Sequence, residues 1–358
     1  MQKLIALYIT LTLISCSVTK TQTSKKIQLQ FLDEYILSDT LKIEGTLVGG
    51  LSGIDYHNGT YYLACDDAQV PRYYTATVNI ENRKIKNVSI KNVVLLSDKK
   101  HYFDLEAIRY SEKENQVYLT SEGHIKYQKN PIFFNVTLDG VVDFYFDIPD
   151  EFLARSVQKP RHNGTLEGLS KSVDTNGFWI AMELPLQMDG PEPQLIPTDS
   201  PVRITHIDST GKTTKQFAYK LDAVAKTPKK DFLVNGLTDI LEYEKDKFFI
   251  IERSYASGLG NQGNTIRIYK ADATKATNIL EMDGLIDAKY VPATKELLFD
   301  FEQVRSQLTN KSIDNIEGIC FGPKLENGNK TLILVSDNNF NSLGEQLNQF
   351  ILLEIQLH

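Results

Sequence analysis

The sequence predicts an all-β protein built as a single β-propeller of four-stranded antiparallel blades. Two observations predict it: a short phrase recurs with a polar residue at its second position, and each copy begins a similar succession of short strands and turns. The copies are Leu51-Ser52-Gly53-Ile54, Leu105-Glu106-Ala107-Ile108, Leu166-Glu167-Gly168-Leu169, Leu237-Thr238-Asp239-Ile240 and Ile316-Glu317-Gly318-Ile319. Because a radial repeat brings equivalent positions to one axis, side chains from distant parts of the sequence can meet there.

A β-hairpin is expected after each copy of the phrase. In the first unit, Asn58-Gly59 supplies a tight turn before the apolar stretch 60–65, and two further strands are expected at 72–80 and 88–95. The next three units repeat this order, with a weaker last strand at 276–281 in the fourth unit. Four short strands per unit are what a propeller blade requires.

The predicted propeller has six blades, with five repeats clear and the sixth either degenerate or composite. Segments 285–288 and 297–300 form either a degenerate sixth unit or the outer strands of the fourth. Alternatively, residues 29–37 pair with strands near 350–355, which avoids an open sheet edge. Short helical loops are expected at 152–157 and 221–226, and the proline-rich segment 187–201 is expected to be an irregular loop that frames a site.

The N-terminal segment is predicted to direct export. Lys3 precedes an apolar stretch at 4–14 that is too short to span a bilayer, and Leu13-Ile14-Ser15-Cys16 is similar to a bacterial lipobox. We therefore expect a signal peptide over 1–16 with acylation of Cys16, a polar tether over 17–36 and the propeller over 37–358. The alternative is an ordinary secreted protein. A lipid anchor on the periplasmic face of the outer membrane is the expected location.

Composition narrows the class of partner. The formal net charge of −7 argues against a nucleic-acid partner and no second apolar stretch is long enough to span a membrane. Cys65 and Cys320 fall in the first and last repeats, which ring closure makes neighbours. Two buried free thiols are favoured there over a disulfide, although an exported protein permits either.

Several motifs, taken in order, resemble the phytase-like family described as "esterase-like activity of phytase". The resemblance covers about 38–357. Its motifs are Gly50-Leu51-Ser52-Gly53-Ile54, Asp104-Leu105-Glu106-Ala107-Ile108, Asn163-Gly164-Thr165-Leu166-Glu167-Gly168-Leu169, Glu252-Arg253-Ser254-Tyr255, Asp314-Asn315-Ile316-Glu317-Gly318 and Ser336-Asp337-Asn338-Asn339-Phe340. It implies a six-bladed propeller related to calcium-dependent phytases, and a hydrolase of phosphate esters with an acidic active site. The chain departs from the pattern at Thr238 and has no standard phosphatase signature.

The second position of the phrase is the first candidate site. Glu106, Glu167 and Glu317 hold it in three units, with Ser52 and Thr238 in the others. Carboxylates crowded at one axis raise each other's pKa unless a cation is present, and oxygen ligands without His or Cys suit Ca²⁺. We predict that Glu106, Glu167 and Glu317 bind a divalent cation, with Asp104 and Asp314 as possible further ligands. The alternative is a structural cation or a hydrogen-bonded plug.

A second set of acids ends the second strand of each unit. Its members are Asp66, Asp67, Glu122, Glu183, Glu252 and Asp337. Glu122, Glu183, Glu252 and Asp337 are predicted to act in catalysis by orienting water, although strand-end acids are as often turn formers. Arg161, Arg253 and Lys295 are predicted to bind the phosphate of an anionic substrate. For His101, His124 and His162 a surface role is favoured over acid/base catalysis.

Together these observations predict an exported, lipid-anchored phosphoric ester hydrolase that uses a divalent cation and acts on a small anionic substrate. The reaction class comes from the family resemblance and from no spacing in the sequence. Two alternatives stay open. One is a non-catalytic binding or scaffold propeller of the cell envelope, and the other is a metal-dependent propeller hydrolase of another class, such as a lactonase.

Overall fold

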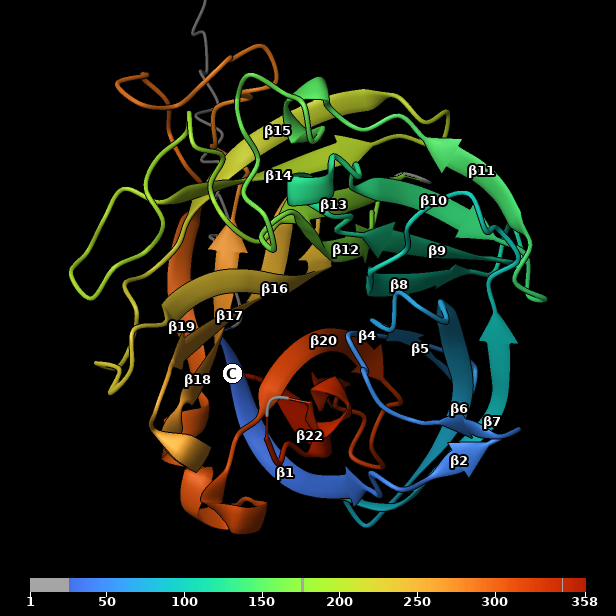
Figure 1. Cartoon of the computed structure of the whole chain (residues 1–358). Coiled ribbons are helices and arrows are strands. Elements are labelled where there is room, and N and C mark those ends of the chain that lie inside the picture. The colour runs from blue at the N-terminus through green and yellow to red at the C-terminus, as the bar shows by residue number, and fades with distance from the viewer. Residues whose placement is uncertain (1–25, 175–176, 343) are drawn as a thin grey trace, which may run out of the picture.

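The computed structural model describes residues 26–174, 177–342 and 344–358, and it arranges them as a five-bladed β-propeller (Figure 1). Each blade is a four-stranded antiparallel sheet. The first three blades are β4 (Gly53–His57), β5 (Thr60–Cys65), β6 (Arg72–Glu81) and β7 (Lys84–Leu95); β8 (Leu105–Ser111), β9 (Gln116–Ser121), β10 (Ile132–Val136) and β11 (Val142–Phe146); β12 (Leu166–Lys171), β13 (Phe178–Met182), β14 (Pro201–Ile207) and β15 (Thr213–Lys220). The fourth is β16 (Leu233–Glu244), β17 (Lys247–Ala256), β18 (Asn264–Asp272) and β19 (Thr294–Asp300).

The fifth blade joins the two ends of the described chain. It consists of β20 (Asn315–Gly322), β21 (Thr331–Asp337), β22 (Asn348–Leu357) and β1 (Ile27–Leu37), which pairs with β22 from Ile27↔Leu357 to Leu37↔Asn348. The all-β propeller of four-stranded blades is confirmed, but the expected six blades are wrong. The composite sheet exists, yet it completes the fifth blade, because β20 to β22 supply three strands and leave one edge for β1 to cover.

Two boundaries also change. Segment 297–300 lies in β19, the outer strand of the fourth blade, which is one of the two expected alternatives, whereas segment 285–288 and the expected strand at 276–281 lie outside the sheet. Residues 27–36 belong to the propeller and not to the tether, because β1 contains them. The predicted signal peptide and Cys16 lie outside the described residues.

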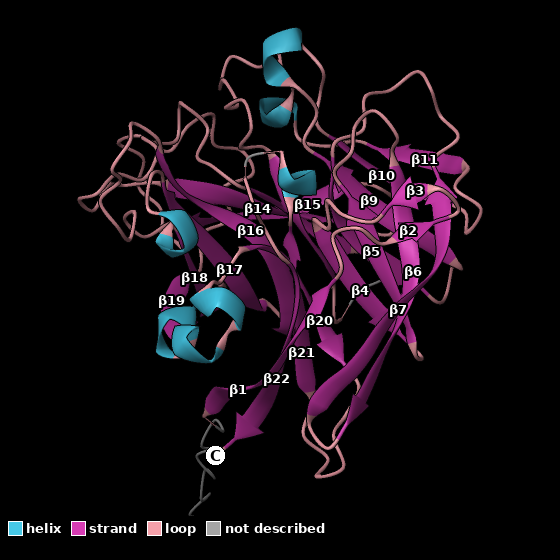
Figure 2. Ribbon diagram, turned by 60° about the horizontal axis from the view of Figure 1, so that its bottom comes forward, coloured by secondary structure: helices cyan, strands magenta, loops and turns pink. Residues whose placement is uncertain are grey.

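The remaining elements are small. A two-stranded hairpin, β2 (Lys42–Ile43) with β3 (Thr46–Leu47), precedes the first blade. The described residues contain no α-helix, and their 3₁₀ turns are η1 (Ile125–Tyr127), η2 (Asp150–Phe152), η3 (Gly260–Gln262), η4 (Phe301–Gln303), η5 (Arg305–Gln307), η6 (Thr309–Lys311) and η7 (Asn339–Asn341). Many of the longer loops lie on one side of the ring of strands (Figure 2). Across this described part of the chain, no helix has the length and apolarity needed to cross a membrane.

The innermost strands β4, β8, β12, β16 and β20 surround the axis, each beside the next, and β20 closes the ring against β4 (Figure 1). Apolar side chains pack between neighbouring blades and form the core. Cys65 and Cys320 are both buried in the core between the first and fifth blades, and both are free thiols, as predicted.

A buried ion pair closes the axis of the ring. Arg109 and Asp239 are both fully buried, and two N–H···O contacts of 2.9 and 3.0 Å join the guanidinium to the carboxylate. Both side chains also bind the backbone at the fourth position of the repeated phrase. Arg109 donates to the carbonyl oxygens of Ile54, Ile108, Ile240 and Ile319, and Asp239 accepts from the amides of Leu169, Ile240 and Ile319. This axial plug therefore links all five blades.

Small residues at the third position of the phrase let the inner strands approach one another beside the plug. A Cβ built on Gly53 would lie 2.7 Å from the carbonyl oxygen of Glu106, and one built on Gly318 would lie 3.0 Å from the Cα of Gly53. Only the fourth copy carries a longer side chain here, and it is Asp239 of the plug. The repeated phrase thus supplies the packing that lets five short strands meet at one axis.

Candidate functional site

The second position of the phrase faces the axis because it lies in a β-bulge. The pairing of inner and second strands shifts between Leu166 and Gly168, and equivalent shifts occur in the second, fourth and fifth blades. A bulge leaves one residue unpaired and re-aims its side chain. Glu106, Glu167 and Glu317 are consequently placed around the axis, each at most 8% exposed.

The two hydroxyl side chains at this position connect neighbouring blades. The hydroxyl of Ser52 donates to the carbonyl oxygen of Leu105, 2.7 Å away, and that of Thr238 donates to the carbonyl oxygen of Ile316 at 3.2 Å. Leu105 and Ile316 directly precede Glu106 and Glu317. Ser52 and Thr238 therefore hold the backbone beside Glu106 and Glu317, and their protons are already used.

The acids that end the second strands lie near the same axis in the first, second, third and fifth blades. The fourth blade differs. The backbone N–H groups of Glu122 and Glu183 bond to Asp104 and Thr165, just before the phrase, and Asp66 and Asp337 occupy the matching positions. In the fourth blade Glu252 pairs with Leu237, so Arg253 takes the matching place. The predicted equivalence of Glu252 is therefore wrong by one residue, and a shift of one residue moves a strand side chain to the opposite face.

Glu252 and Lys295 lie together in a different network. The Glu252 carboxylate accepts hydrogen bonds from the Lys295 ammonium and the Tyr219 hydroxyl, both at 2.6 Å, and from Asn235 at 2.8 Å. Lys295 lies on the outer strand β19 and also pairs with Asp222 at 2.7 Å. Arg161 is likewise occupied, since it binds Pro185, Gly190 and Glu192 of the loop after the third blade's second strand.

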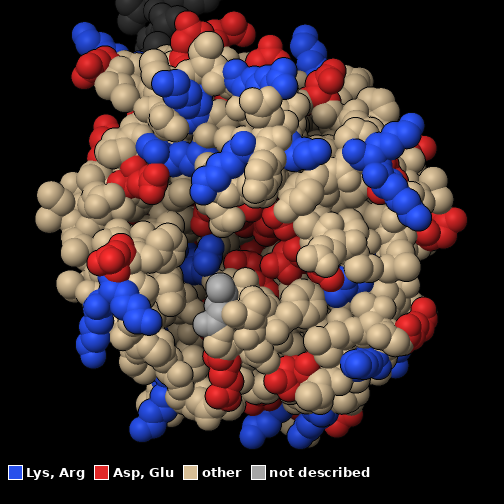
Figure 3. All heavy atoms as spheres, viewed as in Figure 1, with Lys and Arg blue, Asp and Glu red and all other residues tan. Residues whose placement is uncertain are grey.

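A group of carboxylates fills the space above the axial plug, and we call it the acidic centre. Its members are Asp66, Asp104, Glu106, Glu122, Glu167, Glu183, Glu317 and Asp337. Figure 3 shows acidic side chains on the floor of the central hollow. Burial, together with the neighbouring carboxylates, raises the pKa of Glu106, Glu122 and Glu167 well above its usual value.

The remaining members of the acidic centre also hold protons more tightly than usual. Burial raises the pKa of Asp104 to about 6, of Glu183 to about 7, and of Glu317 and Asp337 to about 8. Such shifts concentrate at functional sites, where charge is held without full compensation. The acidic centre therefore favours the binding of positive charge, either as protons or as a metal cation.

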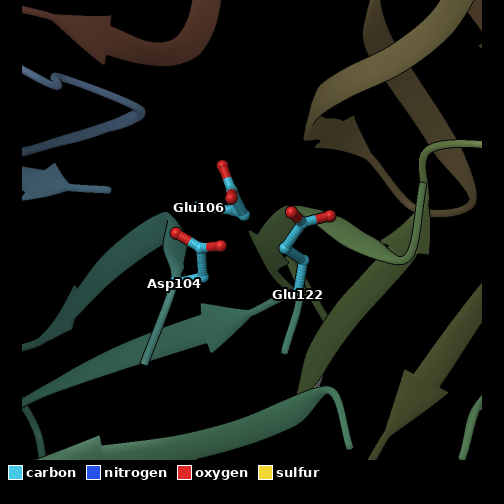
Figure 4. Close-up of side chains that lie close together, drawn as sticks. All are labelled: Asp104, Glu106 and Glu122. Atoms are coloured by element: carbon cyan, nitrogen blue, oxygen red, sulfur yellow. The ribbon is translucent and has the colours of Figure 1, made fainter. Parts of the chain in front are cut away.

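Three of these carboxylates form a group that fits a metal ion. One oxygen from each of Asp104, Glu106 and Glu122 lies within 4.8 Å of the others, and the three side chains point toward a common space (Figure 4). Ca²⁺–oxygen bonds of about 2.3–2.6 Å place ligand oxygens at such separations. The Oε2 atom of Glu122 is buried without a hydrogen-bond partner in the described structure, so this oxygen is available to a cation.

The predicted cation ligands are thus partly regrouped. Glu106 belongs to the group of three, whereas Glu167 and Glu317 face it without joining it. Asp104, expected as a further ligand, belongs to this group, and its position two residues before Glu106 is the signal in the sequence. Asp314 instead accepts hydrogen bonds from the amides of Asn315 and Leu347.

A guanidinium from the fourth blade reaches the acidic centre. Arg253 lies 3.1 Å from Glu183 and 3.8 Å from Glu317, and it donates to the side-chain oxygen of Asn315 at 2.6 Å. Its Nε is buried without a partner among the described residues. The fourth blade thus contributes a positive charge where the other blades contribute carboxylates.

Two of the three histidines named from the sequence lie near this side of the ring. The rings of His124 and His162 are 4.3 Å apart, and His124 also stacks against Tyr127. Burial, with His124 and Lys126 nearby, lowers the pKa of His162. His101 instead contacts Asp98 and Tyr145 away from the axis.

A protein-family model named Phytase-like, described as esterase-like activity of phytase, matches residues 46–340. The chain belongs to this family. The match runs from the hairpin before the first blade to the loop after β21, so it includes every member of the acidic centre. No curated protein sequence matches this family member at a significant level.

Solved structures similar to this family member have low sequence identity. One is a putative oxidoreductase (glucose dehydrogenase) from Thermus thermophilus, with 10% identity and a TM-score of 0.40 over 92% of this chain and 100% of that chain. Another is an α-L-arabinofuranosidase from Podospora anserina, with 11% identity and a TM-score of 0.43 over 92% and 97%. Similarities of this size say nothing about activity.

Proposed function

We propose that this protein hydrolyses phosphate esters at the acidic centre with the help of a divalent cation, Ca²⁺ by the chemistry of its ligands. One observation carries the proposal. The group Asp104, Glu106 and Glu122, with its unpartnered Glu122 oxygen, lies in the same acidic centre as the guanidinium of Arg253, whose charge acts on Glu122. A phosphate would be attracted there by both the cation and the guanidinium. The family name supports the reaction class.

Each residue has a distinct part in this proposal. Asp104, Glu106 and Glu122 would hold the cation, which when bound polarises a phosphoryl oxygen and offsets negative charge. Arg253 donates hydrogen bonds to the phosphate. Glu183 is the candidate general acid or base, because its pKa is about 7 and its Oε2 is buried without a partner among the described residues, free to hold or release a proton.

Glu167, Glu317 and Asp337 line the rest of the central hollow, which we call the well. Their carboxylates keep the electrostatic potential in the well negative, so that a cation binds before the anionic substrate does. The axial plug closes the well on its other side, and substrate would therefore enter and leave from the face shown in Figure 3.

The test is hydrolysis of a phosphomonoester, a phosphodiester and a lactone, each with Ca²⁺ and with a chelator. We expect Ca²⁺-dependent turnover of a phosphate ester, and we expect Glu183→Gln to lower kcat/KM by about 10²-fold. Glu122→Gln should weaken Ca²⁺ binding at least about tenfold. Glu112→Gln is the matched control, because Glu112 is exposed on the surface and 73% of its side chain is accessible.

Three results would contradict the proposal. Turnover that survives the chelator and Glu122→Gln would remove the cation from the reaction. Turnover of the lactone alone would indicate another class of hydrolase. Tight Ca²⁺ binding without turnover of any substrate, in a folded protein, would indicate a binding propeller.

We also propose that Cys16 is acylated and anchors the protein at the periplasmic face of the outer membrane. The motif Leu13-Ile14-Ser15-Cys16 and the polar segment after it support this proposal. Cys16→Ser should move the protein from the membrane fraction to the soluble fraction. Membrane retention of that variant would contradict the anchor.

A further inference from the structure

A second cavity opens beside the acidic centre, between the first, second and fifth blades, and we call it the side pocket. Its volume is about 480 Å³. Side chains of two kinds dominate its lining: carboxylates and aromatic rings. The lining residues used below are Asp66, Asp67, Tyr102, Asp104 and Phe340.

The charge of the side pocket selects against anions. Asp66, Asp67 and Asp104 line it, and no lysine or arginine does among the residues that the structure describes. The Arg72 guanidinium pairs with the Asp67 carboxylate at an N–O distance of 2.8 Å, but Arg72 is buried and does not line the pocket. A negatively charged group would be repelled from this pocket, whereas a positively charged one would gain favourable interactions with at least two carboxylates.

The aromatic ring of Phe340 is held in the pocket by an unusual backbone. Asn339, Phe340 and Asn341 have φ values of 44°, 48° and 58°, which a bulky residue such as phenylalanine rarely adopts. The side-chain oxygen of Asn338 accepts from the amides of Phe340 and Gly50, at 3.2 and 3.0 Å. The fold therefore fixes this ring at some energetic cost.

Gly50 allows Phe340 and Asp66 to meet. Its φ is +61°, and a Cβ there would lie 2.1 Å from Oδ1 of Asp66 and 2.7 Å from the Phe340 ring. The ring also contacts a cation already, because the Arg72 guanidinium lies 5.5 Å from its centroid. An aromatic face beside carboxylates is the arrangement that recognises alkylammonium groups.

The side pocket is continuous with the group proposed to hold the cation. Asp104 belongs to both, and the Tyr102 hydroxyl donates to Asp104 at 3.3 Å. Glu122, whose Oε2 is buried without a partner among the described residues, belongs to the same group of carboxylates as Asp104. A phosphate bound at Asp104, Glu106 and Glu122 would therefore place one of its ester substituents in the side pocket.

We propose that this substituent carries an alkylammonium group, so that the substrate is a phosphate ester of a choline- or ethanolamine-like amino alcohol. Tyr102 and Phe340 contribute aromatic rings to the lining beside the ammonium, and the Asp66 carboxylate supplies the opposite charge. The inference rests on the proposed phosphate ester hydrolysis for the position of the phosphate, but the side pocket can be tested without turnover.

The first experiment compares two substrates of equal shape in the presence of Ca²⁺. They are 4-nitrophenyl phosphocholine and the 4-nitrophenyl phosphodiester of 3,3-dimethylbutanol, in which a neutral tert-butyl group replaces the trimethylammonium. We expect kcat/KM to favour the ammonium substrate by about tenfold or more. Phe340→Leu should reduce this preference, whereas Phe232→Leu, at an exposed phenylalanine that does not line the pocket, should leave it unchanged.

The second experiment measures binding alone, by calorimetric titration of the full chain with choline and with 3,3-dimethylbutanol. We expect choline to bind and the alcohol not to bind. Glu122→Gln should leave choline binding intact, because that substitution changes the cation group and not the side pocket. If Ca²⁺ displaces choline, or if Glu122→Gln abolishes choline binding, then choline occupies the cation group and not the side pocket. Either result would overturn the proposal.

The two experiments separate this inference from the proposed function. Equal turnover of both phosphodiesters without choline binding would overturn the inference and leave the hydrolase in place. Choline binding without turnover of either ester would support the side pocket and count against hydrolysis. Turnover of glycerophosphocholine alone would assign a soluble substrate, and turnover of phosphatidylcholine vesicles alone would assign a lipid headgroup; either result supports the inference.

Discussion

Two layers of buried charge are stacked on the propeller axis, and they are built in opposite ways. In the axial plug, Arg109 and Asp239 neutralise each other and bind the backbone of every blade. In the acidic centre, many carboxylates face one another with Arg253 as the cation in contact with them. The repeated phrase supplies Asp239 to the plug and Glu106, Glu167 and Glu317 to the acidic centre. Buried charge is structural where it is paired and a mark of function where it is not.

Breaking the plug should produce the largest change in stability. Arg109→Met leaves the Asp239 charge buried without its partner, so we expect the free energy of unfolding in urea to fall by about 3–5 kcal/mol. Lys171→Met is the control, since its ion pair with Asp55 is partly exposed and should contribute no more than about 1 kcal/mol. Equal losses in the two variants would mean that the plug is not the link between the blades.

The acidic centre should make stability depend on pH in the opposite sense from a protein held by salt-bridged acids. Burial raises the pKa of Glu183 to about 7, and of Glu317 and Asp337 to about 8. The folded protein therefore binds more protons than the unfolded chain between about pH 4 and pH 8, and its stability falls as pH rises through that window. We expect the Tm of the Ca²⁺-free protein to fall by several degrees from pH 5 to pH 9.

Ca²⁺ should restore most of that loss, because the bound cation offsets the negative charge that the acidic centre gains at high pH, chiefly on Asp104, Glu106 and Glu122, whose pKa values burial also raises. Glu167→Gln removes one carboxylate of the acidic centre and should flatten the pH profile, whereas Glu112→Gln at the surface should not. A Tm that rises with pH in the absence of Ca²⁺ would contradict the assignment of raised pKa values to the acidic centre.

The smallest effect is expected away from the axis. Lys295 is held by Glu252 and Asp222 on the outer side of the fourth blade. Lys295→Met should lower the free energy of unfolding by about 1–3 kcal/mol, less than Arg109→Met, because the buried Glu252 keeps its hydrogen bonds from Tyr219 and Asn235. It should leave kcat/KM unchanged, because the side chain is already paired and does not face the well. A raised KM for the phosphate ester would instead return Lys295 to the substrate site.

The count of blades shows what local pattern can and cannot predict. Five copies of the phrase correspond to five blades, because each copy forms one inner strand. The expectation of a sixth came from the family resemblance and from strands that had no evident partner. The pairing of Ile27–Leu37 with β22 joins opposite ends of the described chain, and no local pattern determines which sheet such a strand will complete.

The composition of the site shows the same limit at the level of single residues. Glu106, Glu167 and Glu317 could be placed at the axis from the repeat, and the acids after the second strands could be placed near them. The exchange of Glu252 for Arg253 could not be predicted, because the register of the fourth hairpin, which pairs Leu237 with Glu252, depends on its turn and on a second irregularity between Glu242 and Glu244. Nor does the repeat show that Asp239, alone at its position, reaches Arg109.

The sequence by itself determined the class of fold, the positions of five inner strands and the supply of carboxylates and small residues at the axis. These follow from short-range physics: strand alternation, turn residues and a repeated phrase. Tertiary structure alone decided which charges are paired and which are not. Arg109 meets Asp239, and Arg253 meets Glu183, only because the ring closes, and that closure depends on contacts between residues far apart in the chain.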